Sequence, residues 1–166
     1  MGIIYAISDI HGYYDIMEKT LEQVDLKDVD NKLVLCGDYI DYGPDSCKVL
    51  YRIKELMEIY PGQVIALKGN HETMFLEFLG ADDQNLWNVE WLSTDKGFST
   101  INTFISEKLK EQIRNFYSEN NTIASFYKLA KLIKEDIKIH HRELVNWLKD
   151  LPLYYETEKK SSFMQG

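Results

Sequence analysis

Residues 3–12 have the sequence IIYAISDIHG, and the same arrangement returns at residues 32–38 (KLVLCGD) and 63–72 (QVIALKGNHE). Each stretch begins with a run of apolar residues, which is typical of a buried strand, and ends in polar residues and glycine. Residues 13–24 and 44–60, which lie between these stretches, place their apolar side chains at helical spacing. This alternation predicts a β-α-β-α-β unit with a parallel sheet and right-handed crossovers.

The rest of the chain is predicted to be mainly helical. A third helix fits residues 73–79, a less regular stretch follows it, and two long helical segments fit residues 101–117 and 122–149. Residues 157–166 form a polar tail. Because the sequence contains no internal repeat and no linker-like segment, we expect one α/β domain over residues 1–166.

The composition excludes several classes of protein. The 166 residues are 45% hydrophobic and 28% charged, which is ordinary for a globular domain and excludes a disordered or low-complexity chain. A formal net charge of -8 disfavours binding to nucleic acid or to an anionic membrane surface. The apolar runs are far shorter than the ~20 residues that span a bilayer, and the N-terminus lacks a basic, apolar signal pattern. We therefore expect a soluble cytoplasmic protein.

Polar side chains that can bind metals follow each of the three predicted strands. The carboxyl ends of parallel strands meet at one edge of a sheet, where ligands gather. A single Asp or His after a strand is usually a turn residue or a helix cap, but three such clusters together favour a shared site. Carboxylate and imidazole ligands suit Mn, Fe, Zn or Co, and two such ions about 4 Å apart can activate a water against a phosphoryl group. The residues concerned are Asp9, His11, Asp38, Asp41, Asn70 and His71.

Three short blocks resemble the signature of a known family. Residues 9–12 (DIHG), 37–43 (GDYIDYG) and 69–72 (GNHE) are similar to the blocks GDxHG, GDxVDRG and GNHE of the calcineurin-like metallophosphoesterases, in particular the phosphoprotein phosphatase branch of serine/threonine phosphatases. Residues 91–100 resemble, more weakly, the family's Trp-Leu…Gly-Gly…Thr element, and residues 151–153 its Leu-Pro before the next strand. The resemblance implies a β-sandwich core with flanking helices.

The resemblance also implies a role for each matching residue. His71 would be the general acid that protonates the leaving alcohol, and Asp41 would orient its imidazole. Asp38 would bridge two divalent metal ions, for which manganese is the first expectation and iron, zinc, cobalt or nickel are alternatives. Asn70 would also bind a phosphate oxygen. The implied metal ligands are Asp9, His11, Asp38 and Asn70.

Two predicted substrate-binding residues differ from the family pattern. Tyr42 stands where the family has an arginine that clamps the phosphate in a bidentate manner, which a phenol cannot copy. Tyr42 can supply one hydrogen bond or a stacking face, which suggests a substrate with an aromatic or nucleotide portion. Lys68 stands where many relatives have arginine and offers a point charge.

The family's two C-terminal metal-binding histidines have no match in this sequence. The unassigned histidines, His140 and His141, lie within a helical pattern and lack the family's flanking glycines, so we expect surface or packing roles. We therefore expect the second metal site to be incomplete and the second sheet to be incomplete or missing, as in a truncated or frame-shifted member of the family or a domain whose remainder lies on another chain. Residues 161–166 are not expected to form a strand. A sheet without its packing partner would expose apolar surface and favour a homodimer.

These observations favour a metal-dependent phosphoesterase. We expect it to hydrolyse phosphomonoesters of the phosphoserine or phosphothreonine type by a metal-activated water, with a phosphorylated protein or a small phosphoester as substrate. One alternative is a symmetrical dinucleoside tetraphosphatase, which the same branch includes. The other is a catalytically inactive remnant that binds a metal or a partner protein.

Overall fold

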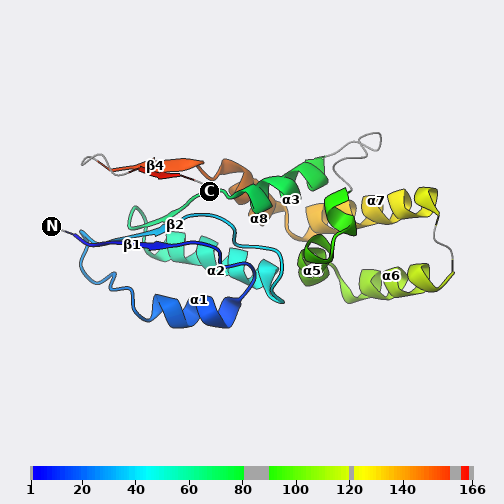
Figure 1. Ribbon diagram of the computed structural model, residues 1–166, viewed down its shortest axis with the longest axis horizontal. Coiled ribbons are helices and arrows are strands. Elements are labelled where there is room, and N and C mark those ends of the chain that lie inside the picture. The colour runs from blue at the N-terminus through cyan, green and yellow to red at the C-terminus, as the bar shows by residue number, and fades with distance from the viewer. Residues whose placement is uncertain (1, 81–89, 120–121, 158–161, 165–166) are drawn as a thin grey trace.

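The first half of the chain alternates between strands and helices, as predicted (Figure 1). The computed structural model describes residues 2–80, 90–119, 122–157 and 162–164. The strands end within one residue or two of their expected limits, and α2 ends before Pro61-Gly62. The elements in order are β1 (Ile4–Ile7), α1 (Tyr14–Leu21), β2 (Lys32–Leu35), α2 (Ser46–Ile59), β3 (Val64–Ala66) and α3 (Asn70–Gly80).

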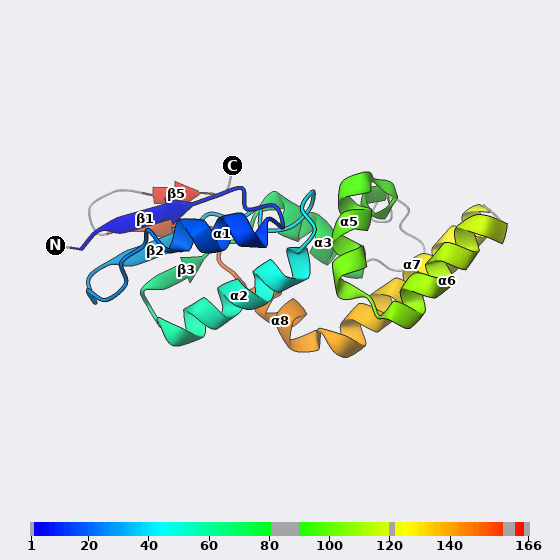
Figure 2. The same ribbon diagram turned by 90° about the horizontal axis from the view of Figure 1, so that it is seen from below.

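The three strands form a parallel sheet with β2 in the centre. Helices α1 and α2 lie together on one side of it (Figures 1 and 2). Leu33 and Leu35 of β2 are fully buried and belong to one hydrophobic cluster with Val49 and Ile53 of α2. This arrangement confirms the predicted α/β class, and it directs the ends of all three strands to the same edge of the sheet.

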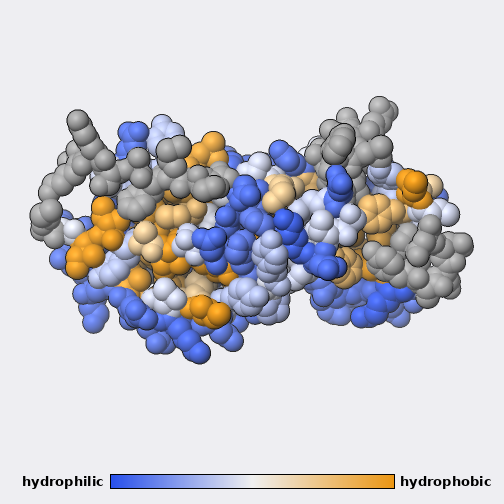
Figure 3. Space-filling view, in the orientation of Figure 1, coloured by the Kyte–Doolittle hydropathy of each residue, from blue (hydrophilic) through white to orange (hydrophobic). Residues whose placement is uncertain are grey.

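Strand β1 is more exposed than the sequence suggests. Ile3 and Ile4 are 55% and 40% exposed, so the expectation of a buried strand at residues 3–7 is wrong at these two positions. Ala6, which is also exposed, pairs with Val34 of β2, which is fully buried. One face of the sheet is therefore covered at β2 and open at β1, as expected of a sheet that lacks part of its packing partner. Figure 3 shows hydrophobic surface at the end of the molecule where the strands lie.

The second half of the described chain is a series of shorter helices. None of the helices in the described ranges is both long and apolar enough to cross a membrane. Helices α6 and α7 pack side by side and extend away from the sheet (Figures 1 and 2). The elements are the 3-10 helix η1 (Trp91–Ser93), α5 (Asp95–Phe104), α6 (Glu107–Glu119), α7 (Ile123–His140), α8 (Arg142–Asp150), β4 (Tyr154–Glu156) and β5 (Ser162–Met164).

The two long helices expected at residues 101–117 and 122–149 are each broken once. Ile105 has an extended backbone, and Ser106, which directly precedes α6, bonds through its N–H and its hydroxyl to the Asp136 carboxylate. His141 leaves the helical conformation and separates α7 from α8. Both breaks depend on contacts between segments distant in sequence, so a local helical period could not reveal them.

A two-stranded antiparallel sheet ends the described chain. Glu156 of β4 pairs with Ser162 of β5, so the expectation that residues 161–166 form no strand is wrong for 162–164. Strand β4 follows Leu151–Leu153 directly, as the resemblance implied. Within the described residues, this second sheet consists of β4 and β5. The other positions of the predicted polar tail, from 158 to 161 and from 165 onward, lie outside the described residues.

Candidate active site

The loops that leave β1 and β2 contain an unusual group of strained residues. A positive φ is uncommon outside glycine because Cβ approaches the backbone. Among the described residues, the non-glycine residues with positive φ are Asp9 (56°), His11 (47°), Asp38 (57°), Asp41 (74°) and Tyr42 (64°). All five are candidate site residues from the sequence. Such strain persists only where the surrounding structure holds it, and it gathers at functional sites.

Backbone contacts lock these loops together. His11 N donates to the Asp38 carbonyl at 2.9 Å, and Gly12 N donates to the Tyr39 carbonyl at 2.7 Å. The loop after β3 approaches as closely, because a Cβ on Gly69 would lie 2.3 Å from Asp38 N and 2.4 Å from Asp38 Oδ1. The three strand ends therefore meet around Asp38, as the parallel topology predicts.

Glu72 is a buried residue that the sequence analysis gave no role. Its carboxylate accepts backbone N–H groups from Gly69 (2.8 Å), Asp38 (2.9 Å), Tyr39 (2.8 Å) and Ile40 (3.3 Å). Burial raises the pKa of this carboxyl to about 7, against the opposing effect of the N–H donors. Glu72 thus joins the first turn of α3 to the loop after β2. The GNHE block contained it, but nothing in the local pattern distinguished it from a surface glutamate.

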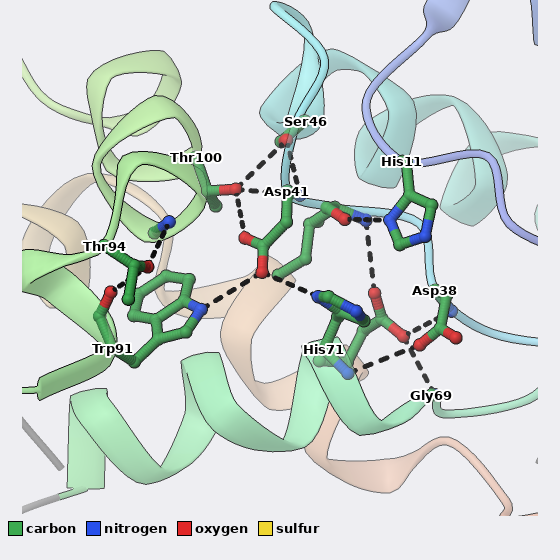
Figure 4. Close-up of polar contacts among 12 residues, drawn as sticks. His11, Asp38, Asp41, Ser46, Gly69, His71, Trp91, Thr94 and Thr100 are labelled. Atoms are coloured by element: carbon green, nitrogen blue, oxygen red, sulfur yellow. Dashed lines mark hydrogen bonds and ion pairs between the residues drawn. The ribbon is translucent and has the colours of Figure 1, made fainter. Parts of the chain in front are cut away.

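Asp41 and His71 form the central hydrogen bond of the site (Figure 4). His71 Nδ1 lies 2.7 Å from Asp41 Oδ2, and Asp41 is fully buried. An ionised carboxylate only accepts hydrogen bonds, so Nδ1 carries the hydrogen and Nε2 remains on the other side of the ring. His71 lies in the first turn of α3, because that helix starts at Asn70 and not at residue 73 as expected. The structure therefore brings together the two predicted catalytic residues.

Two further side chains hold the Asp41 carboxylate. Trp91 Nε1 donates to Oδ2 at 3.1 Å, and Thr100 Oγ1 donates to Oδ1 at 2.6 Å (Figure 4). Gly97 between them is required because a Cβ there would lie 2.1 Å from the Trp91 carbonyl oxygen. These contacts give a physical reason for the Trp…Gly…Thr spacing, whose role the sequence alone did not reveal.

The donor set suits one divalent metal ion. His11 Nδ1 lies 2.9 Å from the Ile40 carbonyl oxygen, to which it can only donate, so His11 Nε2 is left to bind a metal ion. Asp9 Oδ1 lies 3.9 Å from that Nε2. Asp38 Oδ1 accepts the backbone N–H of His71 at 3.3 Å. Carboxylate and imidazole fit a first-row transition metal. Within the described ranges, however, no three His, Cys, Asp or Glu side chains already converge as a closed cluster.

The predicted substrate-binding residues differ in how close their side chains lie to the His71–Asp41 pair. Tyr42 is 56% exposed, and its ring lies edge-on to the His11 ring, with the two centroids 4.9 Å apart. The centroid of the Tyr42 ring is 5.8 Å from that of the His71 ring. Lys68 donates from Nζ to the Lys149 carbonyl at 2.8 Å, so this ammonium would have to leave α8 to bind phosphate. Asn70 is exposed at the first residue of α3. The structure thus places Tyr42, but not the Lys68 ammonium, beside the catalytic pair.

The remaining histidines have structural contacts. His140 is exposed, and its Nδ1 bonds to the Asp136 carbonyl one turn earlier in α7. His141 Nε2 bonds to the Phe104 carbonyl at 2.8 Å, and its Nδ1 lies 2.9 Å from the Tyr51 hydroxyl. The expected surface and packing roles are therefore confirmed.

Comparison with known proteins finds relatives of two named activities. The chain is 34% identical over 84 residues to serine/threonine-protein phosphatase 2 of Escherichia coli (strain K12), covering 51% of this chain and 36% of that protein. It is 37% identical over 101 residues to a symmetrical bis(5'-nucleosyl)-tetraphosphatase of Buchnera aphidicola subsp. Schizaphis graminum, covering 54% and 37%. The chain thus spans little more than a third of the length of these curated relatives.

A solved structure and a family model extend the comparison. The crystal structure of a metallophosphoesterase from Sphaerobacter thermophilus matches with a TM-score of 0.45 and 17% identity, over 93% of this chain and 42% of that one. The sequence model described as calcineurin-like phosphoesterase matches residues 3–163, which include every site residue described above. On this match, the chain belongs to the calcineurin-like phosphoesterase family.

Proposed function

We propose that this chain is a metal-dependent phosphoesterase that hydrolyses phosphomonoesters. The observation that carries the proposal is the His71–Asp41 hydrogen bond of 2.7 Å, set among strained residues that are candidate metal ligands at the carboxyl edge of a parallel sheet. A catalytic acid oriented by a buried carboxylate, next to carboxylate and imidazole donors, suits hydrolysis of a phosphoester. A phosphorylated protein or a small phosphoester is the proposed substrate.

The proposed mechanism assigns one task to each residue. His71 Nε2 holds the proton for the leaving alcohol, because Nδ1 is engaged by Asp41. Asp9, His11 and Asp38 would hold a divalent ion, for which we propose Mn²⁺, and Asn70 with Asp38 would hold a second. When bound, such ions supply Lewis acidity that polarises the phosphoryl group and an attacking water.

A second candidate function has a specific observation in its favour. The Tyr42 ring is 56% exposed and lies beside both His11 and His71, where it could stack on a nucleobase. This arrangement supports a symmetrical dinucleoside tetraphosphatase, in which a phosphoanhydride is cleaved to release nucleoside diphosphates. Tyr42→Leu would then weaken the binding of the tetraphosphate far more than that of a simple alkyl phosphate.

The test is hydrolysis of a chromogenic aryl phosphate by the purified chain, with and without Mn²⁺, beside a His71→Asn variant. Turnover that depends on Mn²⁺ and is lost in the variant supports the proposal. His140→Asn is the matched control, because among the described residues that exposed histidine bonds within its own helix, so the substitution should leave turnover unchanged.

The competing functions give different results in the same assay. Faster release of nucleoside diphosphate from a dinucleoside tetraphosphate than of aryl alcohol from the phosphomonoester favours the second candidate. A wild-type rate equal to that of His71→Asn on both substrates contradicts both enzyme functions and favours a remnant that binds a metal or a partner without turnover.

A further inference from the structure

Lys96 is a cation beside the candidate site that the sequence analysis did not single out. It is the second residue of α5, and its side chain is half-buried. Its Nζ lies over the Tyr42 ring, 5.9 Å from the ring centroid. In the part of the chain that the structure describes, this ammonium has no hydrogen bond or ion pair. A lysine held by an aromatic face alone keeps its donors for a ligand.

The catalytic carboxylate itself fixes the position of Lys96. Trp91 and Thr100, which lie on either side of Lys96 in the sequence, both donate to Asp41. Between them, Thr94 Oγ1 accepts the Gly97 N–H at 3.1 Å and caps the helix. The start of α5 is therefore tied to the loop that holds Asp41 and Tyr42, and the backbone of Lys96 cannot move away from that loop without disturbing these bonds.

The charge around the site makes a local cation useful. The nearby titratable groups are mostly anionic, with Asp9, Asp38 and Asp41 in the loops and Asp95 beside Lys96 in α5. The whole chain has a formal net charge of -8. A phosphomonoester carries close to two negative charges near pH 7, so those of these carboxylates that a metal ion does not neutralise oppose its approach. Lys68, the cation that the sequence suggested, is engaged at α8.

The position of Tyr42 explains why the cation comes from α5. Residue 42 is a tyrosine where the family resemblance led us to expect an arginine, so the loop after β2 supplies no charge there. The tyrosine instead presents one ring to His11 at 4.9 Å and to the Lys96 ammonium at 5.9 Å. One aromatic side chain thus lies between the metal-ligand histidine and the cation.

We propose that Lys96 is a substrate-binding residue whose ammonium contacts the phosphate group held beside His71, with the Tyr42 ring as its support. The inference deepens the proposed function and rests on it for the identity of the ligand. A lysine on a flexible four-carbon stem can move from the ring face to a phosphate oxygen without a change in the backbone. Tyr42 and Lys96 act together as one subsite.

Binding of inorganic phosphate tests the inference without requiring turnover. Isothermal titration of the Zn²⁺-loaded chain with phosphate compares wild type with Lys96→Gln, Lys96→Arg and Lys48→Gln. Lys48 is the matched control, because it also lies over a tyrosine ring, that of Tyr14 at 3.6 Å. We expect Lys96→Gln to raise the Kd by about tenfold, the loss typical of one charge-assisted hydrogen bond, and the other two variants to stay near wild type.

A double-mutant cycle tests the support by Tyr42. Tyr42→Leu should weaken phosphate binding in the wild-type background and have little further effect when Lys96 is already glutamine. Additive effects of the two changes would overturn the shared subsite. An unchanged Kd in Lys96→Gln, an equal loss in Lys48→Gln, or no phosphate binding by wild type would overturn the inference itself.

Turnover separates this inference from the proposed function. A wild-type chain that binds phosphate through Lys96 but does not hydrolyse any phosphoester refutes the proposed function and leaves the subsite intact. A chain that hydrolyses aryl phosphate with the same KM in wild type and in Lys96→Gln keeps the proposed function and refutes the role of Lys96.

Discussion

His71 and Trp91 donate to the same oxygen of Asp41, at 2.7 Å and 3.1 Å. One donor comes from the first turn of α3 and the other from the 3-10 helix that precedes α5. Thr100 occupies the other carboxylate oxygen, so the plane of the Asp41 carboxylate is fixed from both sides. The orientation of the His71 imidazole thus depends on Asp41 and, through it, on Trp91, which lies fifty residues from Asp41 in the sequence.

Replacing Asp41 with asparagine should reduce both catalysis and stability. Three side-chain donors converge on the carboxylate, and the NH₂ group of asparagine cannot accept from the donors that it would face. We expect kcat to fall about a hundredfold or more, because His71 loses its orienting partner. The free energy of unfolding should fall by about 1–3 kcal/mol for each buried donor left without an acceptor. Steady-state kinetics and urea unfolding measure the two effects, with Asp15→Asn as the control.

Trp91→Phe isolates the positioning role of the indole N–H. A phenyl ring can keep the packing against Phe75 and Phe78, whose centroids lie 5.8 and 5.7 Å from the Trp91 ring. We expect a loss of about 1 kcal/mol in the free energy of unfolding, because one buried hydrogen bond is removed. We also expect a change in the pH profile of kcat, because the Asp41 oxygen that orients His71 then accepts one hydrogen bond fewer. Trp147→Phe, in half-buried surroundings on α8, should leave the pH profile unchanged. Equal profiles in both variants would refute the role of Trp91.

The sequence predicted the part of the site that depends on local pattern. Short apolar runs ending in Asp, His, Asn and glycine were enough to place Asp9, Asp38 and His71 at one edge of a parallel sheet, because topology brings strand ends together. The backbone strain at Asp9 and Asp38 also matches the role expected of them.

The sequence could not predict contacts between distant segments. Glu72 resembles any helical glutamate until the fold surrounds it with four backbone N–H groups. The Lys68 ammonium was expected near phosphate, but the end of α8 offers it a carbonyl at 2.8 Å. The break at Ile105–Ser106 likewise depends on Asp136, thirty residues later. In each case a hydrogen bond between segments distant in sequence determines the structure, and the local sequence pattern contains no sign of that bond.

Glu72→Gln should be strongly destabilising although it keeps the size of the side chain. Two backbone N–H groups bond to each carboxylate oxygen, and the amide NH₂ of glutamine would face two of them as a second donor. We expect a loss of about 2–4 kcal/mol, from two unsatisfied buried groups. Urea unfolding of the metal-free protein measures it. Glu77→Gln, on the exposed side of the same helix, should change stability by no more than about 0.5 kcal/mol.

Metal binding should stabilise the folded chain through His11. A ligand that binds only the native state adds about 2.7 kcal/mol at a hundred times its Kd. We expect the midpoint of urea unfolding to rise when Zn²⁺ or Mn²⁺ is added to the metal-free wild type, and this rise to disappear in His11→Gln. His140→Gln removes an exposed imidazole whose Nδ1 bonds to its own helix, so it should retain the full metal effect. A similar loss in both variants would indicate metal binding at the surface instead.

Gly69→Ala should separate the loops that form the site. A Cβ at residue 69 would lie 2.3 Å from Asp38 N, 2.4 Å from Asp38 Oδ1 and 2.5 Å from Glu72 Oε2, and the first of these atoms is backbone that cannot move aside alone. The methyl group therefore has to push the loop after β2 away from α3, which breaks the hydrogen bonds of Glu72 and displaces Asp38. We expect a loss of several kcal/mol in stability together with weaker metal binding, because one contact supports both.

Gly80→Ala is the matched control for that substitution. Gly80 ends the same helix, and a Cβ there would meet no atom within 4 Å, so the change should be neutral or slightly stabilising through helix propensity. Urea unfolding and Zn²⁺ titration of both variants distinguish the causes. If Gly69→Ala lost stability but bound Zn²⁺ as tightly as wild type, the close approach of the two loops would contribute to folding stability and not to metal binding. A joint loss, absent from Gly80→Ala, would show that the metal ligands depend on this contact.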